Sequence, residues 1–105
     1  MAYSEKAHQT KVNTFEDITI QLRNLYDAKN RDYGDSFGQS FEKWGLPMSC
    51  IRLGDKLNRL ESFAQKKEMK VNDEKVEDTL MDLANYAIMT LVELNTKKEG
   101  DIDNV

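Results

Sequence analysis

The stretch "IRLGDKLNRLESF" (residues 51–63) sets leucines at three- and four-residue steps among charged residues. That spacing places the leucines on one side of an α-helix and most of the charges on another. We predict a helix from about Pro47 to Lys67, since proline is tolerated in a first helical turn. Its apolar stripe comprises Leu53, Leu57, Leu60 and Ala64.

Comparable apolar stripes predict helices on both sides of this one. Towards the N-terminus we expect a helix from Thr14 to about Asn30, then a short helix capped by Asp35 or Ser36. Towards the C-terminus we expect a helix from residue 73 to about Asn95. Their apolar residues are Phe15, Ile18, Leu22, Leu25 and Tyr26 in the first, Phe37, Phe41 and Trp44 in the second, and Val76, Leu80, Leu83, Ala87 and Leu91 in the last.

The length of 105 residues indicates a single domain. We predict a helical domain over residues 14–95, with flexible tails over 1–13 and 96–105, where no apolar periodicity is found. The expected fold class is all-α, a compact bundle of about four helices. About 80 residues form only a marginal core for a lone chain, so we expect oligomerisation to complete the bundle.

Composition excludes several classes of function. The formal net charge of −4 argues against binding a nucleic acid polymer, which needs a basic face. Cys50 and His8 are the only residues of their kinds, which excludes cysteine zinc sites and histidine-based catalysis. No apolar run approaches the roughly 20 residues of a membrane span, and no signal-peptide pattern opens the chain. We therefore expect a cytoplasmic protein with no membrane partner.

Asp78, Asp82 and Asn85 fall on one narrow stripe of the last predicted helix, roughly opposite Leu80 and Leu83. One interpretation is a solvated acidic face near the positive end of the helix dipole. The other is a magnesium site, because a hard cation takes carboxylate oxygens and relieves the repulsion between like charges at four-residue spacing. In that case, replacing Asp82 by asparagine should raise the stability of the metal-free protein.

Arg52, Asp55, Lys56 and Arg59 share one face of the helix predicted at 47–67, and we call this set the basic face. Asp55 either pairs with the two arginines along the helix or binds a metal while the three cations take phosphate oxygens. If the last two helices pack antiparallel, the basic face and the acidic stripe meet across one cleft. That arrangement is the one metal-assisted phosphoryl chemistry needs.

The segment "KNRDYGDSFGQSFEKWG" (residues 29–45) would lie at the mouth of such a cleft. Lys29 adds positive charge there, and Asp32 is a candidate to orient an arginine of the basic face. Tyr33 and Trp44 are candidates to stack on a nucleotide base. The competing interpretation places the aromatic residues that follow Gly34 in the core.

Three motifs, "DYGDSF" at 32–37, "RLGDKLNRL" at 52–60 and "EDTLMDLANYAI" at 77–88, occur in this order. Together they resemble the nucleotide modification associated domain 1 family of small phage and bacterial proteins. That family is similar to the MazG-like all-α nucleoside triphosphate pyrophosphohydrolases, which include dimeric dUTPases. The resemblance covers about residues 22–94.

The resemblance implies a bundle that dimerises or forms a dimer of dimers, and magnesium-dependent cleavage of a nucleoside triphosphate to monophosphate and pyrophosphate. In the resembling enzymes, acidic pairs on two helices hold the metal. The second pair corresponds to Asp78 and Asp82, with Asn85 following. The first position carries Arg52 and Asp55 where two glutamates are expected.

Our leading hypothesis is therefore a pyrophosphohydrolase acting on a nucleoside or deoxynucleoside triphosphate. Asp55, Asp78 and Asp82 would hold Mg²⁺, and the cations Arg52, Lys56 and Arg59, assisted by Lys29, would neutralise the triphosphate. The alternative is a protein that sequesters a modified or cyclic signalling nucleotide without cleaving it, because Arg52 replaces a carboxylate. A third reading is a structural helical adaptor, which would need a cleft without convergent charge.

Overall fold

The computed structural model describes residues 2–65 and 75–103, with side chains described as far as Thr96 in the last helix. The described residues form four helices and no strand, which confirms the all-α fold class. The chain divides into two units, Met1–Gly34 and Asp35–Val105. Among the described helices, none is both long and apolar enough to cross a membrane.

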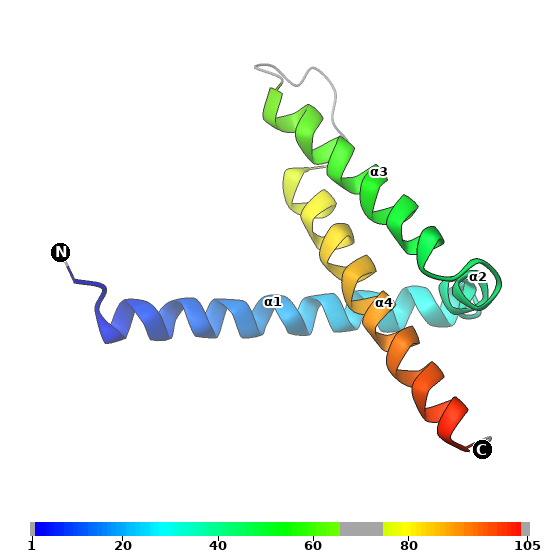
Figure 1. Ribbon diagram of the computed structural model, residues 1–105. Helices are drawn as coiled ribbons and strands as arrows, with labels where there is room; N and C mark the ends of the chain where they lie inside the picture. The colour runs from blue at the N-terminus through cyan, green and yellow to red at the C-terminus, as the bar shows by residue number, and fades with distance from the viewer. Residues whose placement is uncertain (1, 66–74, 104–105) are drawn as a thin grey trace. The chain divides into compact units, whose positions relative to one another are not determined.

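The first unit contains one helix, α1 (Glu5–Asp32), drawn in blue and cyan in Figure 1. It begins well before the predicted start at Thr14, because Ser4 caps it: the Ser4 hydroxyl accepts the backbone N–H of Ala7 at 3.0 Å. Residues 5–13, which the sequence assigned to a tail, are thus helical. They were missed because this stretch is polar all round and has no apolar stripe to reveal a helix.

Asp35 leads into the short helix α2 (Ser36–Trp44), as one of the two predicted caps. It adopts the left-handed conformation, with φ 59°, and its side chain makes no capping hydrogen bond. The carboxylate lies instead over buried Gly38, where an added Cβ would collide with it. A larger residue at position 38 would therefore require the Asp35 side chain to move.

The buried apolar cluster of the second unit is built around α2. Phe37 and Phe41 from α2 pack with Met48 of α3 (Leu46–Gln65), and Tyr86 and Met89 of α4 (Val76–Asp103) pack against them. The rings of Phe37 and Tyr86 stack with centroids 5.9 Å apart. The core interpretation is confirmed for Phe37 and Phe41.

Trp44, the third aromatic residue of α2, does not join this cluster. Its side chain is 64% exposed, and Lys43 Nζ lies 5.2 Å from the centre of its ring. The core interpretation is therefore wrong for Trp44. The reason is its place in the last turn of α2, directly before Gly45, where φ is 70° and the chain turns into α3.

Helices α3 and α4 run side by side in opposite directions, as Figure 1 shows in green and in yellow to red. Contacts between Ser49 and Thr90 and between Lys56 and Asp82 fix this antiparallel register, which the sequence analysis had set as a condition. Helix α4 continues beyond its predicted end at Asn95. Its predicted start at residue 73 lies outside the described residues.

The contact between α3 and α4 is lined by polar side chains, which we call the polar seam. Its members are Ser49 and Lys56 of α3 and Thr79, Asp82, Asn85 and Thr90 of α4. Ser49 and Thr79 are fully buried, and the Thr90 hydroxyl donates to Ser49 Oγ at 2.8 Å. Within the described part of the chain, no buried side-chain nitrogen or oxygen lacks a hydrogen-bond partner. The seam is thus satisfied internally, as buried polar groups must be.

Three of the five residues in the predicted core stripe of α4 are exposed, which corrects the prediction from sequence. Leu80 is 45% exposed and Leu91 58%, and Ala87 is exposed as well, whereas Val76 and Leu83 are half-buried. The helix also has a polar face, on which Thr79 and Thr90 are buried. In α3 the predicted stripe is also only partly covered: two leucines are half-buried, while Leu57 and Ala64 are exposed.

Glu93 of α4 carries an unfavourable charge in this fold. Its pKa is raised above the ordinary value, first by burial and then by the nearby Asp35 carboxylate at the start of α2. A carboxyl group whose pKa is higher in the folded state lowers stability above that pKa, and the penalty disappears as the pH falls through it.

We predict that Glu93→Gln stabilises the protein at pH 7 by roughly a few tenths of a kcal/mol, since water screens part of the effect. The gain should shrink as the pH falls, because the wild-type carboxyl becomes protonated. Thermal melts from pH 7 to pH 4 measure this difference, with Glu61→Gln as the matched control at an exposed position of α3. A variant less stable than wild type at pH 7 would contradict the assignment.

Candidate functional site

An ion pair between α3 and α4 is the centre of the candidate site. Lys56 Nζ lies 2.9 Å from Asp82 Oδ2, and the two side chains are only 22% and 28% exposed. The sequence analysis placed Lys56 on a phosphate and Asp82 on a metal ion. The structure joins them directly, so the basic face and the acidic stripe do meet at this pair.

Asn85 follows Asp82 by one turn of α4 and lies in the polar seam, only 9% exposed. Tyr86 beside it is half-buried and stacks on Phe37. These contacts tie the position of α4 near Asp82 to the apolar cluster around α2. The ion pair is therefore held in place by packing on the α2 side.

Asp78, one turn before Asp82, has a local role at the start of α4. Its carboxylate accepts the backbone N–H of Lys75 at 3.2 Å, and the residue is exposed. This is the return half of a capping box, in which a side chain in the first turn satisfies an N–H that has no partner within the helix. Asp78 therefore stabilises the helix end whether or not it also contacts a ligand.

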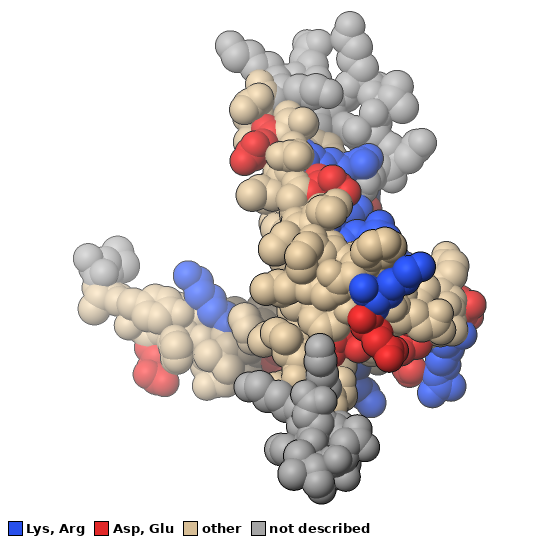
Figure 2. Space-filling view, turned by 45° about the vertical axis from the view of Figure 1, so that its right-hand side comes forward, with Lys and Arg blue, Asp and Glu red and all other residues tan. Residues whose placement is uncertain are grey.

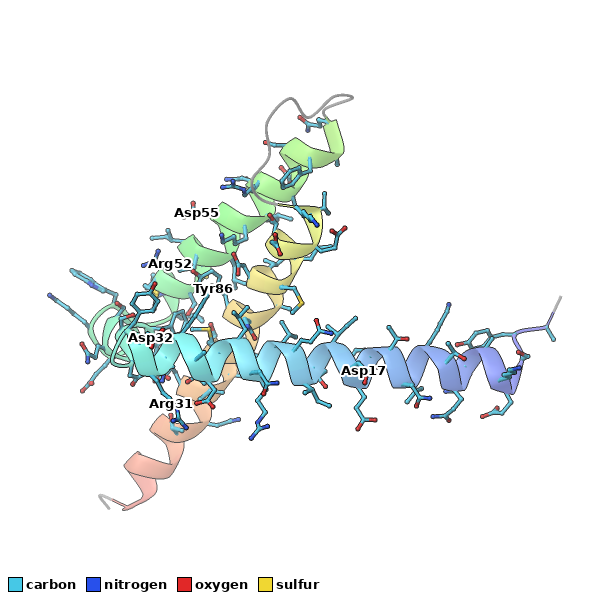
Figure 3. The ribbon with its side chains drawn as sticks, turned by 180° about the vertical axis from the view of Figure 1, so that it is seen from behind. Asp17, Arg31, Asp32, Arg52, Asp55 and Tyr86 are labelled. Carbon is cyan, nitrogen blue, oxygen red and sulfur yellow. The ribbon has the colours of Figure 1, made fainter. Side chains whose placement is uncertain are left out.

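The other members of the basic face are exposed. Figure 3 labels Arg52 and Asp55 on neighbouring turns of α3, and both are exposed, as is Arg59. Figure 2 shows acidic and basic side chains beside one another over the upper part of the α3–α4 pair. The surface there is of mixed charge and does not divide into a basic field and an acidic field.

The three carboxylates proposed as magnesium ligands are not gathered into one site. Among residues 2–65 and 75–96, no group of three or more His, Cys, Asp or Glu side chains could hold a metal ion. Asp82 faces a lysine and Asp78 caps a helix, while Asp55 is exposed on α3. The residues thus do not fit a preassembled magnesium site.

Lys29, Asp32 and Tyr33, the site residues predicted from the bend, belong to the first unit. All three are exposed at the C-terminal end of α1, where the Tyr33 N–H closes the helix on the Lys29 carbonyl at 2.9 Å. Their proposed contacts with a nucleotide stay a prediction.

Three members of the polar seam were missed by the sequence analysis, namely Ser49, Thr79 and Thr90. A signal was present in α3, where Ser49 lies two turns before Lys56 on the same face. Serine and threonine carry little weight in an apolar pattern, so the face they share with charged residues looked like a solvated one. Their burial is what identifies it as a contact surface.

Comparison with known families places the chain. A model of the family described as nucleotide modification associated domain 1 matches residues 29–94. The chain belongs to this family. No curated protein and no solved structure matches it.

The nucleotide modification associated domain extends over α2, α3, most of α4 and the end of α1. It includes every residue that the sequence analysis assigned to the site, from Lys29 to Asn85. It also includes the whole polar seam up to Thr90. The polar seam and the basic face are therefore parts of one family domain.

Proposed function

We propose that this protein is a phage-type, MazG-like pyrophosphohydrolase that cleaves a nucleoside or deoxynucleoside triphosphate to monophosphate and pyrophosphate. The site is the charged face of the α3–α4 pair around Lys56 and Asp82. The observation that carries the proposal is their 2.9 Å contact, through which the basic side of α3 and the acidic side of α4 meet. Phosphoryl chemistry depends on cations for the phosphates beside acids for the attacking water.

Two further observations support the proposal. The description of the family refers to nucleotide modification. The second acidic pair of the MazG-like pyrophosphohydrolases corresponds to Asp78 and Asp82 in the motif at 77–88, and α4, which carries this motif, packs against α3. A nucleotide substrate would also suit the cytoplasm, or the host cytoplasm for a phage-encoded chain, and we propose that location.

The predicted residues of the second unit have distinct tasks in this proposal. Arg52, Lys56 and Arg59 neutralise the triphosphate, and Asn85 contacts the substrate. Asp82 is the carboxylate at the reacting phosphate, which a water attacks, and Asp55 and Asp78 are the two further acids of the proposed site.

Magnesium is the cofactor we propose, although these side chains do not form a preassembled site for it. Mg²⁺ is commonly bound by substrate phosphates, waters and only one or two carboxylates. When bound, it would supply charge neutralisation at the phosphates. A site of this kind does not need the three-acid group that the described residues lack.

We predict that the protein releases pyrophosphate from at least one nucleotide in a panel of ribo-, deoxyribo- and modified triphosphates with magnesium. Asp82→Asn should reduce turnover at least about 100-fold, because it removes a charge at the reacting phosphate. Glu77→Gln is the matched control, since Glu77 is an exposed acid of the same helix outside the site. A folded wild-type protein that releases no pyrophosphate from any nucleotide would sink the proposal.

The Lys56–Asp82 pair also favours a second function, which is sequestration of a modified or cyclic signalling nucleotide. Lysine already neutralises the carboxylate within the protein, and Arg52 stands where the resembling enzymes carry an acid. Calorimetry in EDTA separates the two functions. Tight binding without metal and without turnover would indicate sequestration, while binding that is lost with the metal would indicate the enzyme.

We also propose that the protein is a homodimer or higher homo-oligomer, with the outward stripe of α4 in the interface. Leu80, Ala87, Leu91 and Leu94 lie on this stripe, and the leucines are 38% to 58% exposed. The stripe spans about 20 Å of helix, and a second copy offers the same apolar row in a two-fold arrangement. The second unit needs such a cover, because the described part of the unit has a buried apolar cluster of only Phe37, Phe41 and Met48.

Sedimentation of the wild-type chain should therefore give at least twice the monomer mass of 12.2 kDa. Leu91→Glu should dissociate it by placing a charge in the apolar row. Ile51→Glu is the control, because Ile51 is 66% exposed on α3 and lies outside the stripe. A monomeric wild type would show that no second copy covers the stripe.

A further inference from the structure

We infer that Lys56 is the built-in counter-ion of Asp82 and keeps divalent metal ions off that carboxylate while no nucleotide is bound. The sequence predicts a magnesium site at Asp82, whereas the structure shows a lysine ammonium at this carboxylate. The exclusion of metal ions by Lys56 follows from the geometry of this ion pair alone. The release of Asp82 by a nucleotide, which is the second part of the inference, rests on the proposed function.

The ammonium group occupies the place that a metal ion would need. At 2.9 Å, Lys56 Nζ makes a charge-assisted hydrogen bond to Asp82 Oδ2. A magnesium ion would bind the same oxygen at about 2.1 Å, which would set it within a few ångström of the ammonium. Both side chains are largely buried, so water screens the repulsion between the two cations only in part.

The neighbouring groups that the structure describes do not compensate for this repulsion. A divalent ion beside a lysine would need several acidic ligands, and no group of three possible ligands is found among the described residues. The closest acid along α4 by helical position is Asp78, which is engaged with the Lys75 N–H. The Asp82 carboxylate carries a single negative charge, and the positive charge of Lys56 already balances it.

A nucleotide changes this balance because it brings its own anionic oxygens. The Lys56 side chain is long enough to leave Asp82 for a phosphate oxygen, since the four-carbon stem is flexible. The exchange keeps the ammonium paired and leaves the Asp82 carboxylate unpaired. Metal ions and nucleotides should therefore bind this protein together, and a metal ion should not bind first.

Manganese binding to the full chain without nucleotide tests the exclusion of metal ions, with free Mn²⁺ followed by electron paramagnetic resonance. Wild type should bind Mn²⁺ with a Kd weaker than about 1 mM, the weak end of carboxylate sites. Lys56→Gln should tighten binding at least tenfold, and adding Asp82→Asn should abolish that gain. Lys43→Gln, at an exposed position of α2, should leave the affinity unchanged.

Equal affinities of wild type and Lys56→Gln would overturn the inference. If Lys56→Gln does not fold, as judged by its thermal melt, wild type and Asp82→Asn decide the question: sub-millimolar binding that Asp82→Asn removes would also overturn it. The assay contains no nucleotide, so a protein that fails to cleave nucleotides can still show the expected manganese result. Failure of the proposed function and failure of this inference are therefore distinguishable.

Discussion

The contact between Lys56 and Asp82 is the constraint on which the second unit depends. Taking a charged pair largely out of water is unfavourable unless both groups keep their partner, so α3 and α4 must hold the register that joins them. The hydrogen bond between Ser49 and Thr90 is a second contact between the helices, about 10 Å closer to the start of α3. Two polar contacts, two helical turns apart, set an antiparallel alignment that apolar packing alone would leave free to slide.

This polar seam has a consequence for the apolar residues of α4. Because the polar face of the helix is turned to α3, the leucines of the opposite face are left on the outside. A protein that kept these residues only for stability would bury the leucines and expose the acids. Violations of such a simple rule are expected where residues serve chemistry. The cost is a small apolar core, which an oligomer can enlarge.

Much of the fold follows from local pattern, but the facing of α4 does not. The short helix at Phe37 and Phe41 and the helix through Leu53 and Leu60 were predictable, because a break and an apolar period mark each of them. The face of α4 that contacts α3 was not predictable. Both faces of α4 repeat at helical spacing, and only the packing against α3 determines which face is covered. The start of α1 was missed because Ser4 caps a polar stretch.

The candidate site, like the fold, was predictable from the sequence only in part. Helical spacing predicted that Asp82 and Asn85 share a stripe and that Lys56 belongs to a basic face, and the antiparallel packing brings these sides together. Spacing within one helix favoured pairs such as Asp55 with its neighbouring arginines. It gave no information on a pair between helices, because that pair depends on the register of the seam.

A double-mutant thermodynamic cycle on Lys56→Met and Asp82→Asn tests the central claim most directly. Chemical denaturation of the four proteins gives the coupling energy of the two side chains, free of their separate effects. We expect a stabilising coupling of about 1 kcal/mol or more, and we expect Asp82→Asn alone to lower stability, because it removes a carboxylate from contact with a largely buried ammonium. The magnesium interpretation of the sequence led to the opposite expectation for Asp82→Asn. A coupling near zero, or an Asp82→Asn protein more stable than wild type, would contradict the account.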